Sequence, residues 1–170
     1  MTPTLIHGDH VSCSRVGGSM RRESSRLRQH GLTLDDALGG LADWKGPEAE
    51  SSRAAIAATI RVLRATADDL DEAGAALQSY ATDLAEGHEL GRRAEQRVHE
   101  AGLLLDGSRV VEPWGPASAE EAEQRRTQIP KIQARVDLAT VCVGRARGRL
   151  AREMRRLAQA LSEEHSRVAR

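Results

Sequence analysis

Apolar residues recur every three or four positions through most of this chain, and this spacing constrains the fold more than any other feature. The most regular stretch begins at Ile132 and continues to Val168. A period of three to four residues places side chains on one face of an α-helix. The chain has no Phe and only 2% aromatic residues, so small aliphatic side chains must form its core. We therefore predict an all-α fold, an elongated antiparallel helical bundle or coiled coil.

The same spacing delimits two helices in the first two thirds of the chain. The first is predicted over residues 10–42, with Asp9 as its N-cap. The second starts at Pro47, a residue well suited to a first helical position, and continues for about 55 residues. A bend in this second helix is expected at Gly87 or Gly91.

A loop and a returning helix complete the prediction. Residues 106–117 contain two prolines and two glycines, which indicate a loop, and Ser118 is a fair N-cap for a helix over residues 118–168. Pro130 either bends this helix or divides it. The predicted organisation is an N-terminal arm (1–9), a helical hairpin (10–90) and a helical extension (91–170).

Charge gives little reason to expect nucleic acid as a partner, because 25 basic and 25 acidic residues cancel. The balance is uneven, however. Residues 1–116 carry 13 basic and 18 acidic residues, and residues 117–170 carry 12 and 7. The arginine run over 145–156 could bind nucleic acid, but it lacks interleaved aromatic residues. We predict instead that it pairs with acidic residues of the same chain.

Chain reversals near residues 43–46 and 106–116 predict how the helices align. The arginines over 145–156 would then face residues 66–77, and Arg21 and Arg22 would approach the same segment. That segment contains four acidic residues: Asp68, Asp69, Asp71 and Glu72. Cys13 and Cys142 would lie at one height, so two interpretations stay open, a disulfide bridge or two half-buried free thiols.

No segment indicates a membrane span or a cleavable signal peptide. No apolar run approaches the ~20 residues that a membrane span needs. The N-terminus lacks a basic region followed by a long apolar stretch. We expect the chain to be cytoplasmic, at least before any export.

Nothing in the sequence indicates catalysis or a cofactor. His7, His10 and Cys13 have a spacing that zinc accepts, but a closed tetrahedral site needs a fourth ligand, so we interpret them as ordinary N-terminal residues. Neighbouring acidic residues such as Asp35 and Asp36 point about 100° apart on a helix, which suits solvent better than one substrate. No phosphate-binding loop is present. We predict a protein that is not an enzyme.

The first turn carries the one family resemblance. Trp44, Lys45 and Gly46 form a Trp-x-Gly motif, with "GDH" opening the first helix and "LQSYATDLAE" closing the hairpin. Residues 8–90 thereby resemble the Trp-x-Gly (WXG, early-secreted-antigen-like) substrates of type VII secretion in actinobacteria and related bacteria. The resemblance implies a hairpin that pairs with another hairpin, and a Trp44 that serves recognition at the tip. The alternative is that Trp44 is only a hydrophobic plug.

The chain also departs from the family pattern. Family members often carry a Tyr followed four residues later by an acidic residue as an export signal, whereas Tyr80 is followed at that spacing by Leu84, with Asp83 one residue early. This departure puts autonomous export in doubt. Trp114 lies directly before a Gly, so it does not repeat the motif, and we predict that it plugs the second turn.

Two hypotheses for function follow. The first is a non-enzymatic protein associated with type VII secretion, either a substrate or a targeting partner for an effector, with a protein partner that is an effector, a paralogue or a second copy. It would act by packing a helical face that includes Leu63, Leu70 and Leu77. The second is a cytoplasmic structural coiled coil that self-associates and has no role in secretion. The first predicts a monomer or dimer whose Trp44 matters for binding, the second a Trp44 that matters for stability.

Overall fold

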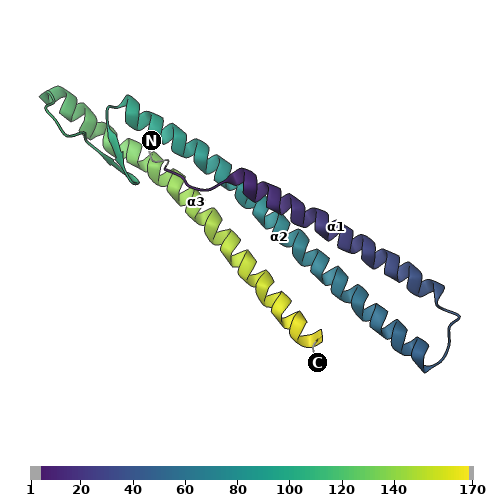
Figure 1. The fold of residues 1–170 in the computed structure, drawn as a ribbon. Helices are drawn as coiled ribbons and strands as arrows, with labels where there is room; N and C mark the ends of the chain where they lie inside the picture. Colours follow the sequence, from purple (N-terminus) through teal and green to yellow (C-terminus); the bar gives the residue numbers. More distant parts are fainter. Residues whose placement is uncertain (1–4, 169–170) are drawn as a thin grey trace. The chain divides into compact units, whose positions relative to one another are not determined.

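The computed structural model describes residues 5–168 and confirms the all-α fold class (Figure 1). The elements in chain order are α1 (His10–Gly40), α2 (Pro47–Glu100), β1 (Leu104–Asp106), β2 (Arg109–Val111) and α3 (Ala119–Val168). At 1.5 Å per residue, the 54 residues of α2 extend for about 80 Å. No helix within the described residues is both long enough and apolar enough to cross a membrane.

The chain forms two compact units, and each unit is built from two segments that are far apart in the sequence. Unit 1 joins the chain up to Ser12 with Ser79–Leu150, and unit 2 joins Cys13–Gln78 with the chain from Ala151 onward. Unit 1 therefore holds the N-terminal arm, the strands and most of α3. Unit 2 holds most of α1, the first turn and the preceding part of α2.

Two predicted helix starts are confirmed by their caps. At α1, the backbone N–H groups of Val11 and Ser12 donate to Asp9 Oδ1 at 2.9 and 3.2 Å. The hydrogen bonds from Ser12 lower the pKa of the Asp9 carboxyl. At α3, Ser118 Oγ accepts from the Glu121 N–H at 3.2 Å, and Glu121 accepts from the Ser118 N–H at 3.0 Å. This reciprocal arrangement is a capping box.

The loop predicted over residues 106–117 is wrong at its start, because a β-hairpin forms there. After α2 ends at Glu100, Gly102 adopts a φ of +62°, which a side chain would disfavour, and the chain turns. β1 and β2 pair antiparallel, with Leu105 opposite Val110. The signal for this hairpin was the Gly107-Ser108 pair, which forms the two-residue turn between the strands and is a common hairpin sequence.

The alignment of α3 on α2 also differs from the prediction. Arg156 pairs with Glu72 as expected, but Arg149 Nη2 pairs with Asp83 Oδ2 at 2.7 Å, outside residues 66–77. The displacement is about two helical turns. Its cause is the segment after α2, because α3 begins beyond the end of α2 (Figure 1).

Glycines on α2 permit close packing in unit 1. A Cβ on Gly87 would lie 2.2 Å from Val143 Cγ2 on α3, and a Cβ on Gly91 would lie 3.1 Å from Ile6 in the arm. α2 continues through both positions, which we had expected to mark a bend. α3 likewise continues through Pro130, so this proline does not divide the helix.

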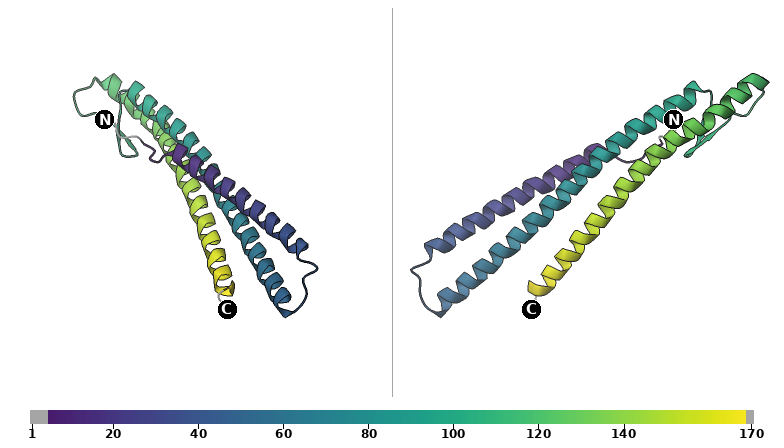
Figure 2. Two further views of the ribbon diagram at one scale, coloured as in Figure 1. Left: turned by 45° about the vertical axis from the view of Figure 1, so that its right-hand side comes forward. Right: turned by 180° about the vertical axis from the view of Figure 1, so that it is seen from behind.

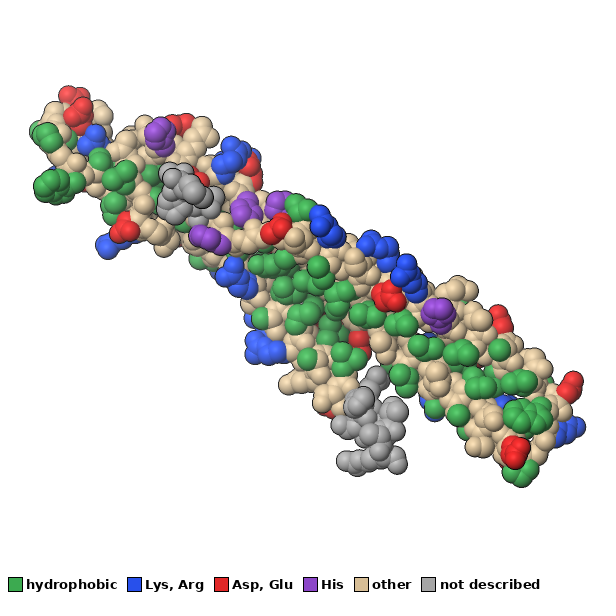
Figure 3. Space-filling view, in the orientation of Figure 1, with side chains coloured by type: hydrophobic (Ala, Val, Ile, Leu, Met, Phe, Trp, Pro, Cys, Tyr) green, Lys and Arg blue, Asp and Glu red, His purple; other side chains and the backbone are tan. Residues whose placement is uncertain are grey.

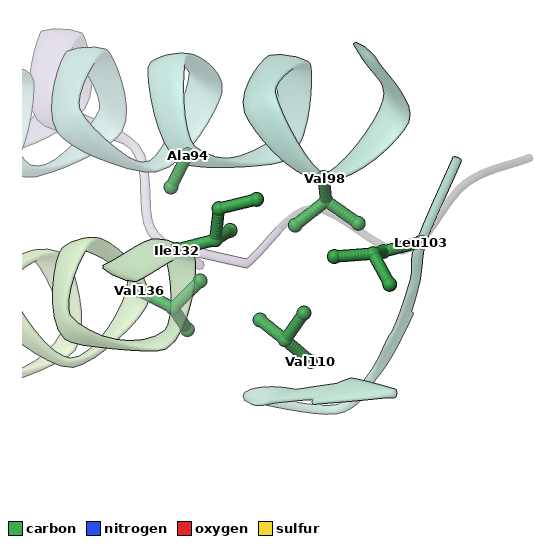
Figure 4. Packing of buried hydrophobic residues seen from close by; sticks show 6 residues of the cluster. All are labelled: Ala94, Val98, Leu103, Val110, Ile132 and Val136. Atoms are coloured by element: carbon green, nitrogen blue, oxygen red, sulfur yellow. The ribbon is translucent and has the colours of Figure 1, made fainter. Parts of the chain in front are cut away.

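The core of unit 1 is a cluster of buried aliphatic side chains from three elements and one turn (Figure 4). α2, α3, the turn before β1 and β2 contribute its members: Ala94, Val98, Leu103, Val110, Ile132 and Val136. Both views of Figure 2 show the β-hairpin beside the paired ends of α2 and α3. The hairpin thus closes an end that two helices alone would leave open.

The N-terminal arm adds a second cover to unit 1. The Leu5 N–H donates to Glu95 Oε1 at 2.6 Å, and Ile6 is buried. Gly8 follows with a φ of +136°, and its carbonyl oxygen lies 3.0 Å from His88 Nε2. These contacts hold the arm against α2 as it enters α1.

Candidate partner-binding surface

The first turn in unit 2 is built from backbone hydrogen bonds and one glycine. The Trp44 N–H donates to the Leu41 carbonyl at 3.2 Å, and the Glu50 N–H donates to the Gly46 carbonyl at 3.1 Å. Gly46 has a φ of +113°, a conformation that residues with a side chain rarely adopt. The Gly of the Trp-x-Gly motif is therefore required by the backbone.

Arg53, which sequence reasoning missed, ties this turn to α2. Its Nη1 donates to the carbonyl oxygens of Trp44 at 2.7 Å and Leu41 at 3.3 Å. A cation is well placed beside carbonyls at the end of α1, where the helix dipole is negative. The turn is thereby fixed while the Trp44 side chain stays 41% exposed. That exposure makes Trp44 neither a fully buried plug nor a free ring.

Small residues bring α1 and α2 close together behind this turn. Gly17, Ser24 and Gly31 are the buried residues of α1 and recur every seven positions. A Cβ on Gly17 would lie 2.7 Å from the Gly74 carbonyl oxygen, so these backbones nearly touch. On a helix, the residue three positions after a contact residue and the residue four positions after it lie on opposite sides of the contact.

One side of the α1–α2 contact is charged. Arg21 Nε pairs with Asp71 at 3.1 Å, Arg28 with Asp68 at 2.9 Å and Arg64 with Asp35 at 3.0 Å. We call these six residues the charged edge. Arg21 reaches the acidic segment as predicted, whereas Arg22 donates to Ser19 on its own helix. All these side chains remain substantially exposed, so each pair contributes little, about 0.2–1 kcal/mol.

The other side of the contact is apolar, and we call it the apolar edge. Its members follow the heptad spacing of the contact line and are only half-buried: Met20, Leu27 and Leu34 on α1, and Leu63, Leu70 and Leu77 on α2. Figure 3 shows hydrophobic side chains gathered in groups along the hairpin half of the molecule toward the turn. Unit 2 therefore leaves a long apolar face incompletely covered.

α3 completes this face only in part. In unit 2 it contributes the buried Leu157, and Arg156 pairs with Glu72 and Glu153. These two carboxylates raise the pKa of the Arg156 guanidinium, and the Arg156 contact lowers the pKa of Glu153. One turn beyond Leu157, Leu161 is 43% exposed.

The residues resembling an export signal lie in unit 1, away from the solvent or already paired. Tyr80 is buried, with 9% of its surface exposed. Asp83 holds the 2.7 Å ion pair with Arg149. The structure thus brings Leu63, Leu70 and Leu77 onto one face, but it does not join Tyr80 and Asp83 to that face.

Other sequence predictions concern the two cysteines, the second tryptophan and the histidines. Cys13 and Cys142 are both free and partly buried, so the disulfide interpretation is not supported. Trp114 is fully exposed, which makes its predicted role as a plug wrong. His10 lies against His88, with ring centroids 5.8 Å apart. Within residues 5–168, no three His, Cys, Asp or Glu side chains gather as metal ligands would.

The fold and this surface define a class, an all-α protein whose helical hairpin has one charged and one apolar edge. Searches among protein-family models, curated proteins and solved structures found no match to the chain.

Proposed function

We propose that this chain is a non-enzymatic protein of a type VII secretion system, and that it binds a helical partner along the apolar edge. The observation that carries the proposal is the partly exposed apolar edge of a hairpin whose turn holds the Trp-x-Gly motif. A partner helix lying along Leu63, Leu70 and Leu77 removes the rest of their surface from water. Half-burial of a leucine-sized side chain is worth roughly 1 kcal/mol, so a whole row supplies several before the costs of association.

The charged edge determines which side of the hairpin a partner can bind. Paired arginines and aspartates on one side of the hairpin offer no apolar area to a partner, so docking is favoured on the other side alone. Trp44, in the turn of the same hairpin, is 41% exposed and adds an aromatic side chain, a residue type enriched at binding hot spots.

Between the two secretion roles, escort fits the site better than independent export. A signal that a secretion apparatus reads must be accessible, whereas Tyr80 is buried and Asp83 is held by Arg149. In the escort role, the partner supplies the export signal and this chain supplies the surface that holds the partner.

Export and capture in a bacterium with a type VII system test the proposal. The tagged chain is expressed in that strain and in the same strain lacking the system. We expect it to leave the cell, or to co-purify with a protein that does, in the intact strain only. Leu70→Glu and Trp44→Ala abolish this behaviour. The matched control is Leu32→Glu, because Leu32 is 52% exposed on α1 and is not part of the apolar edge.

Circular dichroism of each variant checks that the helices are retained. Equal behaviour of the chain in both strains would contradict the proposal. If the isolated chain then forms a multimer by light scattering that survives Trp44→Ala, the structural coiled coil is the better account. The unbroken 50-residue α3 is the observation that favours this alternative.

A further inference from the structure

A second surface of the α2–α3 pair in unit 1 is open, in contrast to the end that the β-hairpin closes. Two adjoining cavities of about 370 and 410 Å³ lie along it. They share Arg97, Glu100 and Arg135, so they form one trough. No residue of this trough belongs to the apolar edge of unit 2.

The trough has an apolar floor and a basic rim. Ala94 and Ile132 are buried beneath it, and Leu138 is 52% exposed at its side. The rim contains four cations and one carboxylate: Arg93, Arg97, Lys131, Arg135 and Glu100. An apolar floor ringed by guanidinium groups suits a flat aromatic side chain, because cations attract the face of such a ring.

Two of these cations lack a partner within the described residues. Arg93 pairs with Glu89 at 2.8 Å, and Arg97 pairs with Glu100 at 3.4 Å. Hydrogen bonds from Arg92 and Arg93 lower the pKa of the Glu89 carboxyl. Lys131 and Arg135, by contrast, make no ion pair or hydrogen bond with any residue in the described part of the chain. Their charges are available to a ligand.

Unit 1 also carries a fully solvent-exposed aromatic side chain. Trp114 has a relative exposure of 103% and lies between Pro113 and Pro116. A tryptophan of this kind leaves about 150–250 Å² in water. The two prolines restrict the loop, so placing the ring in a site costs little conformational entropy.

We propose that Trp114 of a second copy of this chain binds in the trough. Its indole lies on the apolar floor, and Arg97 and Arg135 stack at its faces. Either cavity is larger than an indole ring. The zero net charge of the chain imposes no overall repulsion between copies. Each copy carries both a trough and a Trp114. Two copies can therefore each insert Trp114 into the trough of the other and form a closed dimer.

A nucleic acid is the competing ligand for a basic surface, and the trough suits it less well. No aromatic residue in the described part of the chain lines either cavity, so a strand of bases would lack the aromatic side chains on which successive bases stack. Much of the floor is also aliphatic. This inference is independent of the proposed function, since it depends on unit 1 alone.

Fluorescence of the full chain with Trp114 as its single tryptophan tests the inference. The background variant is Trp44→Phe. We expect Trp114 emission to shift to shorter wavelength as protein concentration rises, in step with a change from monomer to dimer mass by light scattering. Trp114→Ala in the wild-type chain prevents the dimer. Arg135→Glu weakens dimerisation by about tenfold or more, because it replaces an attractive cation with a carboxylate.

Arg109→Glu is the matched control. Arg109 is exposed on β2 in the same unit, and its substitution changes the charge by the same amount as Arg135→Glu. Its dimerisation should equal that of the background variant. A monomer at all concentrations, with Trp114 emission that stays water-exposed, would overturn the inference. So would a dimer that persists in Trp114→Ala. A thymidine oligonucleotide that binds with loss on Arg135→Glu, while the mass stays monomeric, would assign the trough to nucleic acid instead.

Discussion

Unit 1 and unit 2 contain the same three helices, yet they bury their large apolar side chains to different extents. In the described part of unit 1, nine large side chains are enclosed, namely Ile6, Tyr80, Leu84, Val98, Leu103, Val110, Ile132, Val136 and Val143. In the part of unit 2 whose burial is described, Ile60 and Leu157 are the only large apolar residues buried to this degree. Small residues occupy most of its other buried positions.

The difference shows what small residues can and cannot do in a helix contact. Gly17, Ser24 and Gly31 let α1 approach α2 closely, but they contribute little apolar area of their own. The larger side chains are left at the edges of the contact. Unit 1 covers its larger side chains with an arm and a β-hairpin, whereas unit 2 has no such cover within the described residues. Unit 2 is the part that a partner would complete.

Shortening one leucine in each unit should give the largest contrast. Leu84→Ala removes a side chain with 0% exposure and should lower the free energy of unfolding by about 2–5 kcal/mol. Leu70→Ala, in the half-buried row, should cost roughly 1 kcal/mol. Urea unfolding followed by circular dichroism measures both. Equal losses would mean that the two units are packed alike.

Replacing a glycine by alanine should change the stability of the chain by a smaller amount, and the sign should depend on the space around the added methyl group. Gly87→Ala places a Cβ 2.2 Å from Val143 Cγ2 and should destabilise the chain by about 1–3 kcal/mol. Gly144→Ala on α3 meets nothing within 4 Å and should stabilise it by up to about 1 kcal/mol. Thermal unfolding compares the two variants. A stabilised Gly87→Ala would show that α2 and α3 do not approach closely there.

Much of the fold could be predicted from periodicity and caps. Helix spacing located α1, α2 and α3, and Asp9 and Ser118 cap two of them as expected. The β-hairpin was not predicted, although Gly107 and Ser108 signal a turn, because the prolines that follow favour an irregular loop. That omission also displaced the alignment of α3 on α2, since the turn position sets the pairing along both helices.

The candidate surface could be predicted only in part. The seven-residue recurrence of Leu63, Leu70 and Leu77 placed them on one face from the sequence alone. Their half-burial could not be predicted, because it depends on how far the α3 side of the bundle covers them. Arg53 had no sequence signal, since its partners are backbone carbonyls, and the exposure of Trp114 depends on a loop that turns away from the core.

Hydrogen exchange on the isolated full chain tests the central claim most directly, namely that unit 1 completes its own core and unit 2 does not. Amides on α2 are compared within one helix, residues 55–75 against residues 80–98. We predict slower exchange in the second segment, because its opening must expose the enclosed core of unit 1. Equal protection along α2, or stronger protection in residues 55–75, would contradict the account.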